Sequence, residues 1–71
     1  MPILLFKTNI RLKKDLKKIR VLLNALPDIT RWNVDQEDID KVLRIEALKD
    51  NSGELIKIIN QEGYLCEELP D

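Results

Sequence analysis

The chain has 71 residues, of which 44% are hydrophobic and 35% charged, and this length and composition predict one globular domain over residues 1–71 rather than a disordered or fibrous chain. Its formal net charge of −1 argues against nucleic acid as a partner. No apolar stretch reaches the length of a signal peptide or a membrane span, so we expect a cytoplasmic protein with no membrane partner.

The first half of the chain predicts a strand followed by an amphipathic helix. Residues Ile3 to Thr8 form an apolar run bounded by polar residues, which is typical of a strand buried partly on both faces. After Asn9, a candidate N-cap, apolar residues recur at steps of three and four, as on one face of a helix. These residues are Leu12, Leu16, Ile19, Leu22, Leu23 and Leu26. Pro27 cannot continue a helix, so the helix should end near Ala25.

A predicted hairpin follows the helix. From Ile29 the apolar period changes to two, and Trp32 and Val34 share one face of the strand. An acidic turn from Asp35 to Asp40 leads to a second alternating segment, Val42 to Ala47. Two alternating segments joined by a short polar turn favour antiparallel pairing.

The last third predicts a second helix and a short strand. Asn51 followed by Glu54 indicates a capping box, and Gly63 is placed to end the helix in the left-handed conformation. The apolar stripe of this helix consists of Leu55, Ile58 and Ile59, with Ile56 at its flank. Tyr64 to Leu69 predicts a strand whose two glutamates would protect a sheet edge.

The predicted order is strand, helix, strand, strand, helix, strand. Each helix joins two strands and has one apolar face, so we predict an α+β, ferredoxin-like sandwich with a four-stranded antiparallel sheet and both helices on one face. Residues Ile3 to Phe6 are all apolar although a sheet covered on one side needs only alternate ones, so two of them should face the open side. Such a patch favours dimerisation through sheet faces or edges, unless the chain's own ends cover it. The register of this strand stays open.

Three segments carry a resemblance that covers nearly the whole chain: Leu22 to Ile29, Trp32 to Asp35, and Leu55 to Tyr64. In these segments the chain resembles a heavy-metal-associated domain, the unit found in copper chaperones and at the front of metal-pumping ATPases. The resemblance implies the ferredoxin-like fold. The family's metal motif, Met-x-Cys-x-x-Cys, would fall here on Ile10, Leu12 and Asp15.

These three residues do not form a soft-metal site. Copper(I) and zinc carriers need thiolate or imidazole donors, whereas Leu12 has no donor atom and Asp15 is a single oxygen ligand surrounded by lysines. We therefore expect no metal and no cofactor, and Asp15 should favour the positive end of the helix instead. A heavy-metal carrier or metal-transport accessory protein is kept as an alternative. Cys66, the only cysteine, should be a small buried residue.

Charge is distributed unevenly along the chain, because residues 1–34 carry eight basic and two acidic side chains and residues 35–71 carry four basic and eleven acidic ones. The outer face of the first helix is basic and includes Val21, an apolar residue outside the core stripe. We predict a non-catalytic binding module that docks an acidic protein surface, or a second copy of this chain through its acidic turn. The candidate partner-binding residues are Arg11, Lys14, Lys17, Lys18 and Val21. A merely solvated helix face is the alternative.

Two other functions share this architecture. RNA-recognition domains stack bases on aromatic residues of the open sheet face, but this chain has only Phe6, Trp32 and Tyr64, and Trp32 shares a face with Val34. A nucleic-acid-binding domain is therefore an alternative that we do not expect. Acylphosphatases use a glycine-rich phosphate loop, yet residues 7–13 contain no glycine and the chain has no histidine, so we predict no enzyme.

Overall fold

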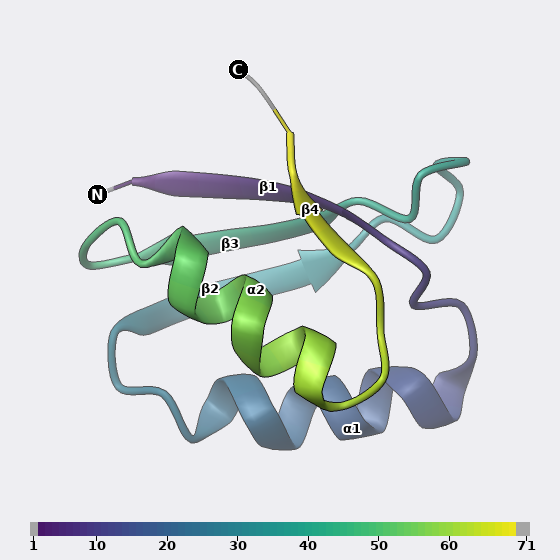
Figure 1. Ribbon diagram of the computed structural model, residues 1–71, viewed down its shortest axis with the longest axis horizontal. Coiled ribbons are helices and arrows are strands. Elements are labelled where there is room, and N and C mark those ends of the chain that lie inside the picture. The colour runs from purple at the N-terminus through teal and green to yellow at the C-terminus, as the bar shows by residue number, and fades with distance from the viewer. Residues whose placement is uncertain (1, 70–71) are drawn as a thin grey trace.

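The computed structural model describes residues 2–69, so residue 1 and residues 70–71 of the predicted domain lie outside this range. Six elements follow in the order β-α-β-β-α-β (Figure 1). They are β1 (Ile3–Thr8), α1 (Lys13–Asn24), β2 (Ile29–Val34), β3 (Leu43–Ala47), α2 (Ser52–Gln61) and β4 (Cys66–Glu68). The strands form one antiparallel sheet in the order β2-β3-β1-β4, which confirms the predicted α+β class and leaves β2 and β4 at the edges.

The core lies between the sheet and the two helices. Leu4 of β1 pairs with Ile45 of β3, and Phe6 pairs with Leu43, so the register of β1 places these four side chains on one face. Both helices contribute buried residues to the same core and therefore cover the same face of the sheet (Figure 1). These residues are Ile19 and Leu23 of α1 and Leu55 and Ile59 of α2.

The opposite face of the sheet is open. Ile3 is 45% exposed and Leu5 is half-buried, whereas Leu4 and Phe6 are buried. The prediction that two apolar residues of the first strand face the open side is therefore confirmed. No helix within residues 2–69 has the length and apolar character needed to span a bilayer.

The start of α1 differs from the prediction. Leu12 is the N-cap and is 53% exposed, so the apolar stripe does not include it. Asn9, the predicted N-cap, instead accepts a hydrogen bond from the Leu65 N–H at 2.9 Å through its Oδ1 atom. The reason is that Ile10 is fully buried: the chain enters the core at this residue, and the helix begins only after the chain has turned outward again.

The N-terminal cap and the apolar stripe of α2 also differ from the prediction. Asn51 is the N-cap of α2, but its side chain makes no capping hydrogen bond, so the predicted capping box with Glu54 is wrong. Ile56, predicted at the flank of the stripe, packs against the core, whereas Ile58, predicted within the stripe, is half-buried outside it. The buried face of α2 therefore consists of Leu55 and Ile59 with Ile56 beside them. Gly63 has a φ of 93° and ends the helix as predicted.

Two strands are shorter than predicted. β3 begins at Leu43, one residue after the predicted start at Val42. β4 covers three residues rather than Tyr64 to Leu69, because the Tyr64 N–H bonds to the Ile59 carbonyl at 3.3 Å and the following N–H bonds to Asn9. These two hydrogen bonds hold the chain away from the sheet until Cys66.

Candidate functional site

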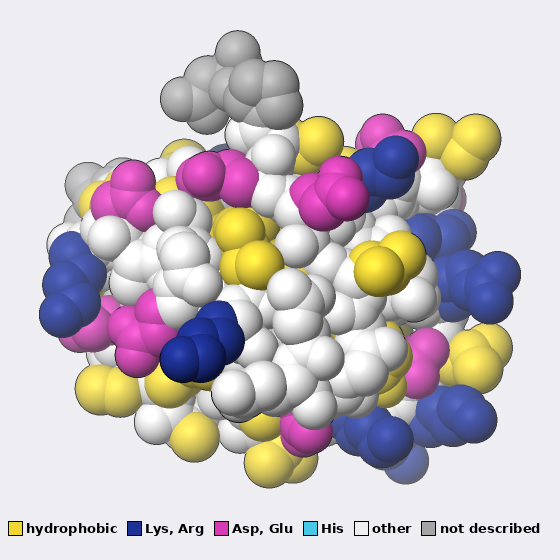
Figure 2. Space-filling view, viewed as in Figure 1, with side chains coloured by type: hydrophobic (Ala, Val, Ile, Leu, Met, Phe, Trp, Pro, Cys, Tyr) yellow, Lys and Arg dark blue, Asp and Glu magenta, His cyan; other side chains and the backbone are white. Residues whose placement is uncertain are grey.

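Four of the five candidate partner-binding residues lie on the outer face of α1. Lys14, Lys17, Lys18 and Val21 follow the helical spacing of three, four and seven residues, and Arg11 comes just before the N-cap. All five are exposed, and we call them the basic face. Ile19 and Leu23, on the other side of the helix, are buried. Figure 2 shows Lys and Arg side chains gathered on the right of the molecule, where α1 begins.

The charges of the basic face are not neutralised by the part of the chain that the structure describes. The ion pairs between residues 2 and 69 join Lys7 to Asp40, Arg31 to Glu46, and Lys49 to Asp28. None of them includes a residue of the basic face. Val21, which lies one helical turn after Lys17 and Lys18, is 72% exposed. The basic face therefore presents to solvent a positive potential with an apolar residue at one end.

Asp15 holds the start of α1. Its Oδ2 atom accepts the Leu12 N–H at 3.0 Å, and its Oδ1 atom accepts the Tyr64 hydroxyl at 2.8 Å. The bond from the Leu12 N–H, followed by that from the Tyr64 hydroxyl, lowers the pKa of Asp15 below its usual value of 3.8. Desolvation, followed by the bond to Asp15, raises the pKa of Tyr64 above 10.0. Both oxygens of the only carboxylate at the start of α1 are thus engaged by the chain itself.

Ile10, Leu12 and Asp15, on which the metal motif is predicted to fall, do not offer a set of metal ligands. Ile10 is fully buried, Leu12 is an exposed hydrocarbon and Asp15 is hydrogen-bonded as described above. Within residues 2–69, no three His, Cys, Asp or Glu side chains lie close enough together to hold a metal ion. Cys66 lies in the core, and its burial raises its pKa to about 11, which keeps the thiol protonated at neutral pH.

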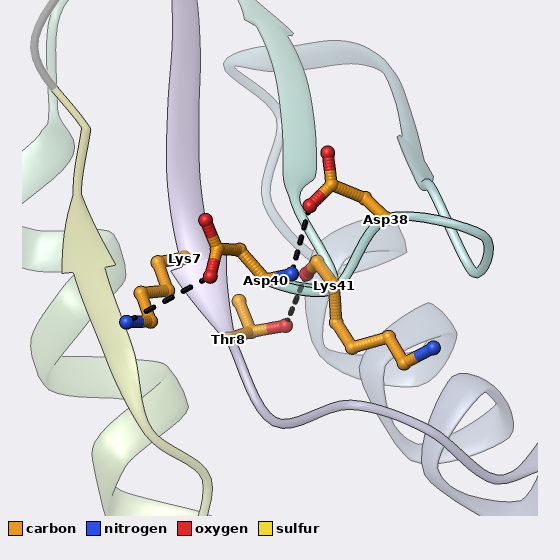
Figure 3. Close-up of polar contacts among 5 residues, drawn as sticks. All are labelled: Lys7, Thr8, Asp38, Asp40 and Lys41. Atoms are coloured by element: carbon orange, nitrogen blue, oxygen red, sulfur yellow. Dashed lines mark hydrogen bonds and ion pairs between the residues drawn. The ribbon is translucent and has the colours of Figure 1, made fainter.

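The acidic turn between β2 and β3 is fastened to the end of β1 (Figure 3). The hydroxyl of Thr8 donates to the Lys41 carbonyl at 2.6 Å, and the Thr8 N–H donates to the Asp40 carbonyl at 3.0 Å. The Asp38 carboxylate accepts the Asp40 N–H at 2.7 Å, and the Asp40 carboxylate lies 3.8 Å from the ammonium group of Lys7. The Asp35 carboxylate accepts the Glu37 N–H at 3.1 Å. Three of the four acidic side chains in this turn therefore have partners within the chain, which leaves fewer of them for the basic face of another copy.

Sequence reasoning missed Thr8, which is buried and polar. Its hydroxyl also accepts the Ile10 N–H at 3.3 Å, so one side chain joins β1, the acidic turn and the connection to α1. The partner of this hydroxyl lies 33 residues further along the chain. No local pattern indicates such a contact.

The open face of the sheet has a shallow hollow of about 560 Å³, whose walls include Leu5, Arg44 and Leu69. The three aromatic residues lie elsewhere. Phe6 is fully buried, Trp32 packs against the core, and Tyr64 donates its hydroxyl to Asp15. The open face therefore has no aromatic platform of the kind on which RNA-recognition domains stack bases.

Comparisons of the chain with protein-family models, with curated proteins and with solved structures found no match. The function is therefore inferred from the residues and the geometry given above.

Proposed function

We propose that this protein is a non-catalytic binding module with a ferredoxin-like fold, and that its basic face docks a partner protein through an acidic surface. The β-α-β-β-α-β order and the strand order β2-β3-β1-β4 support the ferredoxin-like fold. One observation carries the docking proposal: Lys14, Lys17 and Lys18, which have no ion pair in residues 2–69, form a row on one face of α1 that ends at the exposed Val21. Charges of this kind steer association, and an exposed apolar side chain beside them supplies a contact that can be buried.

The likeness to heavy-metal-associated domains is part of this proposal. The chain would be a degenerate member that keeps the scaffold and lacks the metal ligands. The exposed hydrocarbon of Leu12 and the engaged carboxylate of Asp15 support docking over copper carriage, which is the alternative. A nucleic-acid role receives less support, because the aromatic residues do not lie on the open face of the sheet.

Reversing two charges of the basic face tests the docking proposal. The double variant Lys14→Glu and Lys18→Glu should weaken binding to the physiological partner by about 10- to 100-fold, because two attractive contacts become repulsive. The measurement is affinity capture from the native host, followed by a titration with the purified partner. Lys57→Glu is the matched control, since Lys57 is an exposed lysine on α2.

The control should retain every partner that the double variant loses. A partner that binds the wild type and both variants equally well would contradict docking through the basic face.

A further inference from the structure

The two edges of the sheet are protected to different extents. β4 has only three residues, two of which are glutamates. β2 has six residues, of which only Arg31 is charged, and no strand pairs with its outer edge. Natural proteins protect free strand edges with short strands, charges or covering elements, because free N–H and C=O groups pair with other strands. By length and charge, the outer edge of β2 is therefore less protected than that of β4.

The hydrogen bonds to β3 show which main-chain groups of β2 are free. The Asp35 N–H donates to the Val42 carbonyl at 2.9 Å, just beyond the end of β2. In an antiparallel ladder, alternate residues direct their N–H and C=O groups to the same neighbour. The main-chain groups of Asn33 and Arg31 therefore face β3, and those of Trp32 and Val34 point to the free edge.

We propose that a second copy of this protein occupies this edge, with β2 pairing antiparallel to β2 across a two-fold axis so that the two sheets become one. In an antiparallel pair, two residues that lie opposite each other are on the same face of the sheet. The two-fold axis must therefore pass through a position where one β2 residue lies opposite the same residue of the other copy. With the axis at Arg31, two guanidinium groups face each other and repel. With the axis at Asn33, Arg31 of each copy faces Asp35 of the other.

Charge complementarity selects the pairing centred on Asn33. It forms two ion pairs between the copies, and it places Trp32 of each copy opposite Val34 of the other on the core face. Trp32 and Val34 are half-buried in one copy, and no strand lies beside them on the free side. Pairing centred on Trp32 places Arg31 opposite Asn33 and forms no ion pair. Arg31 is available, because its pair with Glu46 is long, at 3.9 Å, and its side chain is 83% exposed.

The test measures the mass of the protein in solution over a wide range of concentration. Sedimentation equilibrium of the wild type should show the 8.3 kDa monomer converting to a species of twice that mass. Asp35→Arg and Arg31→Asp should each raise the dissociation constant of the dimer by about tenfold or more, because two attractive pairs become repulsive. The swap variant R31D/D35R restores both pairs and should return the dissociation constant to the wild-type value.

Two controls give this test its specificity. The basic-face variant Lys14→Glu with Lys18→Glu should dimerise like the wild type, and circular dichroism should show that each single variant is folded. A wild type that stays monomeric at every concentration would overturn the proposal, as would a swap variant that fails to dimerise while both single variants fold. Loss of the dimer in the basic-face variant would overturn it too, by assigning self-association to α1.

Discussion

Asp15 has a structural role in this protein. Its two oxygens accept hydrogen bonds from the Leu12 N–H and the Tyr64 hydroxyl, and so join the start of α1 to the segment before β4. These bonds favour the charged carboxylate and lower its pKa in the folded state. A group with a lowered folded pKa stabilises the fold above its unfolded pKa, and this contribution is lost as the pH falls through the folded pKa.

We therefore expect Asp15→Asn to be less stable than the wild type at neutral pH and equally stable at a pH well below 3.8. Urea unfolding followed by Trp32 fluorescence at both pH values measures the difference. Tyr64→Phe, which removes one of the three hydrogen bonds that Asp15 accepts, should show part of the effect. Glu37→Gln is the control in the exposed acidic turn and should show none. A stability difference that is independent of pH would contradict this role for Asp15.

At the scale of elements, α2 contains Gly53 and is followed by Gly63, and the two glycines differ in the sign of their backbone φ angle. Gly63 has a φ of 93°, a conformation that side chains disfavour, and it ends the helix. Gly53 lies in the first turn of α2 with an ordinary helical backbone. A Cβ atom at either position would meet no heavy atom within 4 Å, so backbone conformation alone should decide the effect of a substitution.

Gly63→Ala should lower the free energy of unfolding by about 1 to 2 kcal/mol, because alanine is strained at positive φ. Gly53→Ala should raise it by about 0.5 kcal/mol, because alanine has less conformational entropy to lose on folding. Denaturant unfolding of the two variants beside the wild type measures both changes. Shifts of the same sign would contradict the assigned helix end.

At the scale of the whole molecule, the two proposed contacts use different forces. The basic face acts through exposed charges, whereas pairing at β2 combines main-chain hydrogen bonds and apolar contacts with two ion pairs. Salt screens exposed charges, with a Debye length of about 8 Å at physiological ionic strength, and leaves the other contributions largely unchanged. The two associations should therefore respond differently to salt.

We expect the affinity for the acidic partner to fall steeply as salt is raised, and the dissociation constant of the dimer to change much less. Titration calorimetry of the partner and sedimentation of the dimer, both at low and high sodium chloride, compare the two responses. An equal salt dependence of both associations would contradict this assignment of forces.

The amino-acid sequence alone determined the order of the elements, most of their bounds and the basic face. These features depend on local periodicity, since apolar residues three and four apart define a helix face and alternating ones define a strand face. The end of α1 at Ala25 likewise follows from Pro27, which cannot continue a helix. The positive φ of Gly63 follows from the wider range of backbone conformations open to glycine.

Only the tertiary structure decided the register of β1, the roles of Thr8 and Asn9, the missing cap at Asn51 and the free edge of β2. Thr8 bonds to Lys41, 33 residues away, and Asn9 bonds to Leu65, 56 residues away. Which strand lies at an edge, and which of its N–H groups are free, depends on the order of all four strands. Such contacts form between residues that no local pattern relates, so they are fixed only when the chain packs around one core.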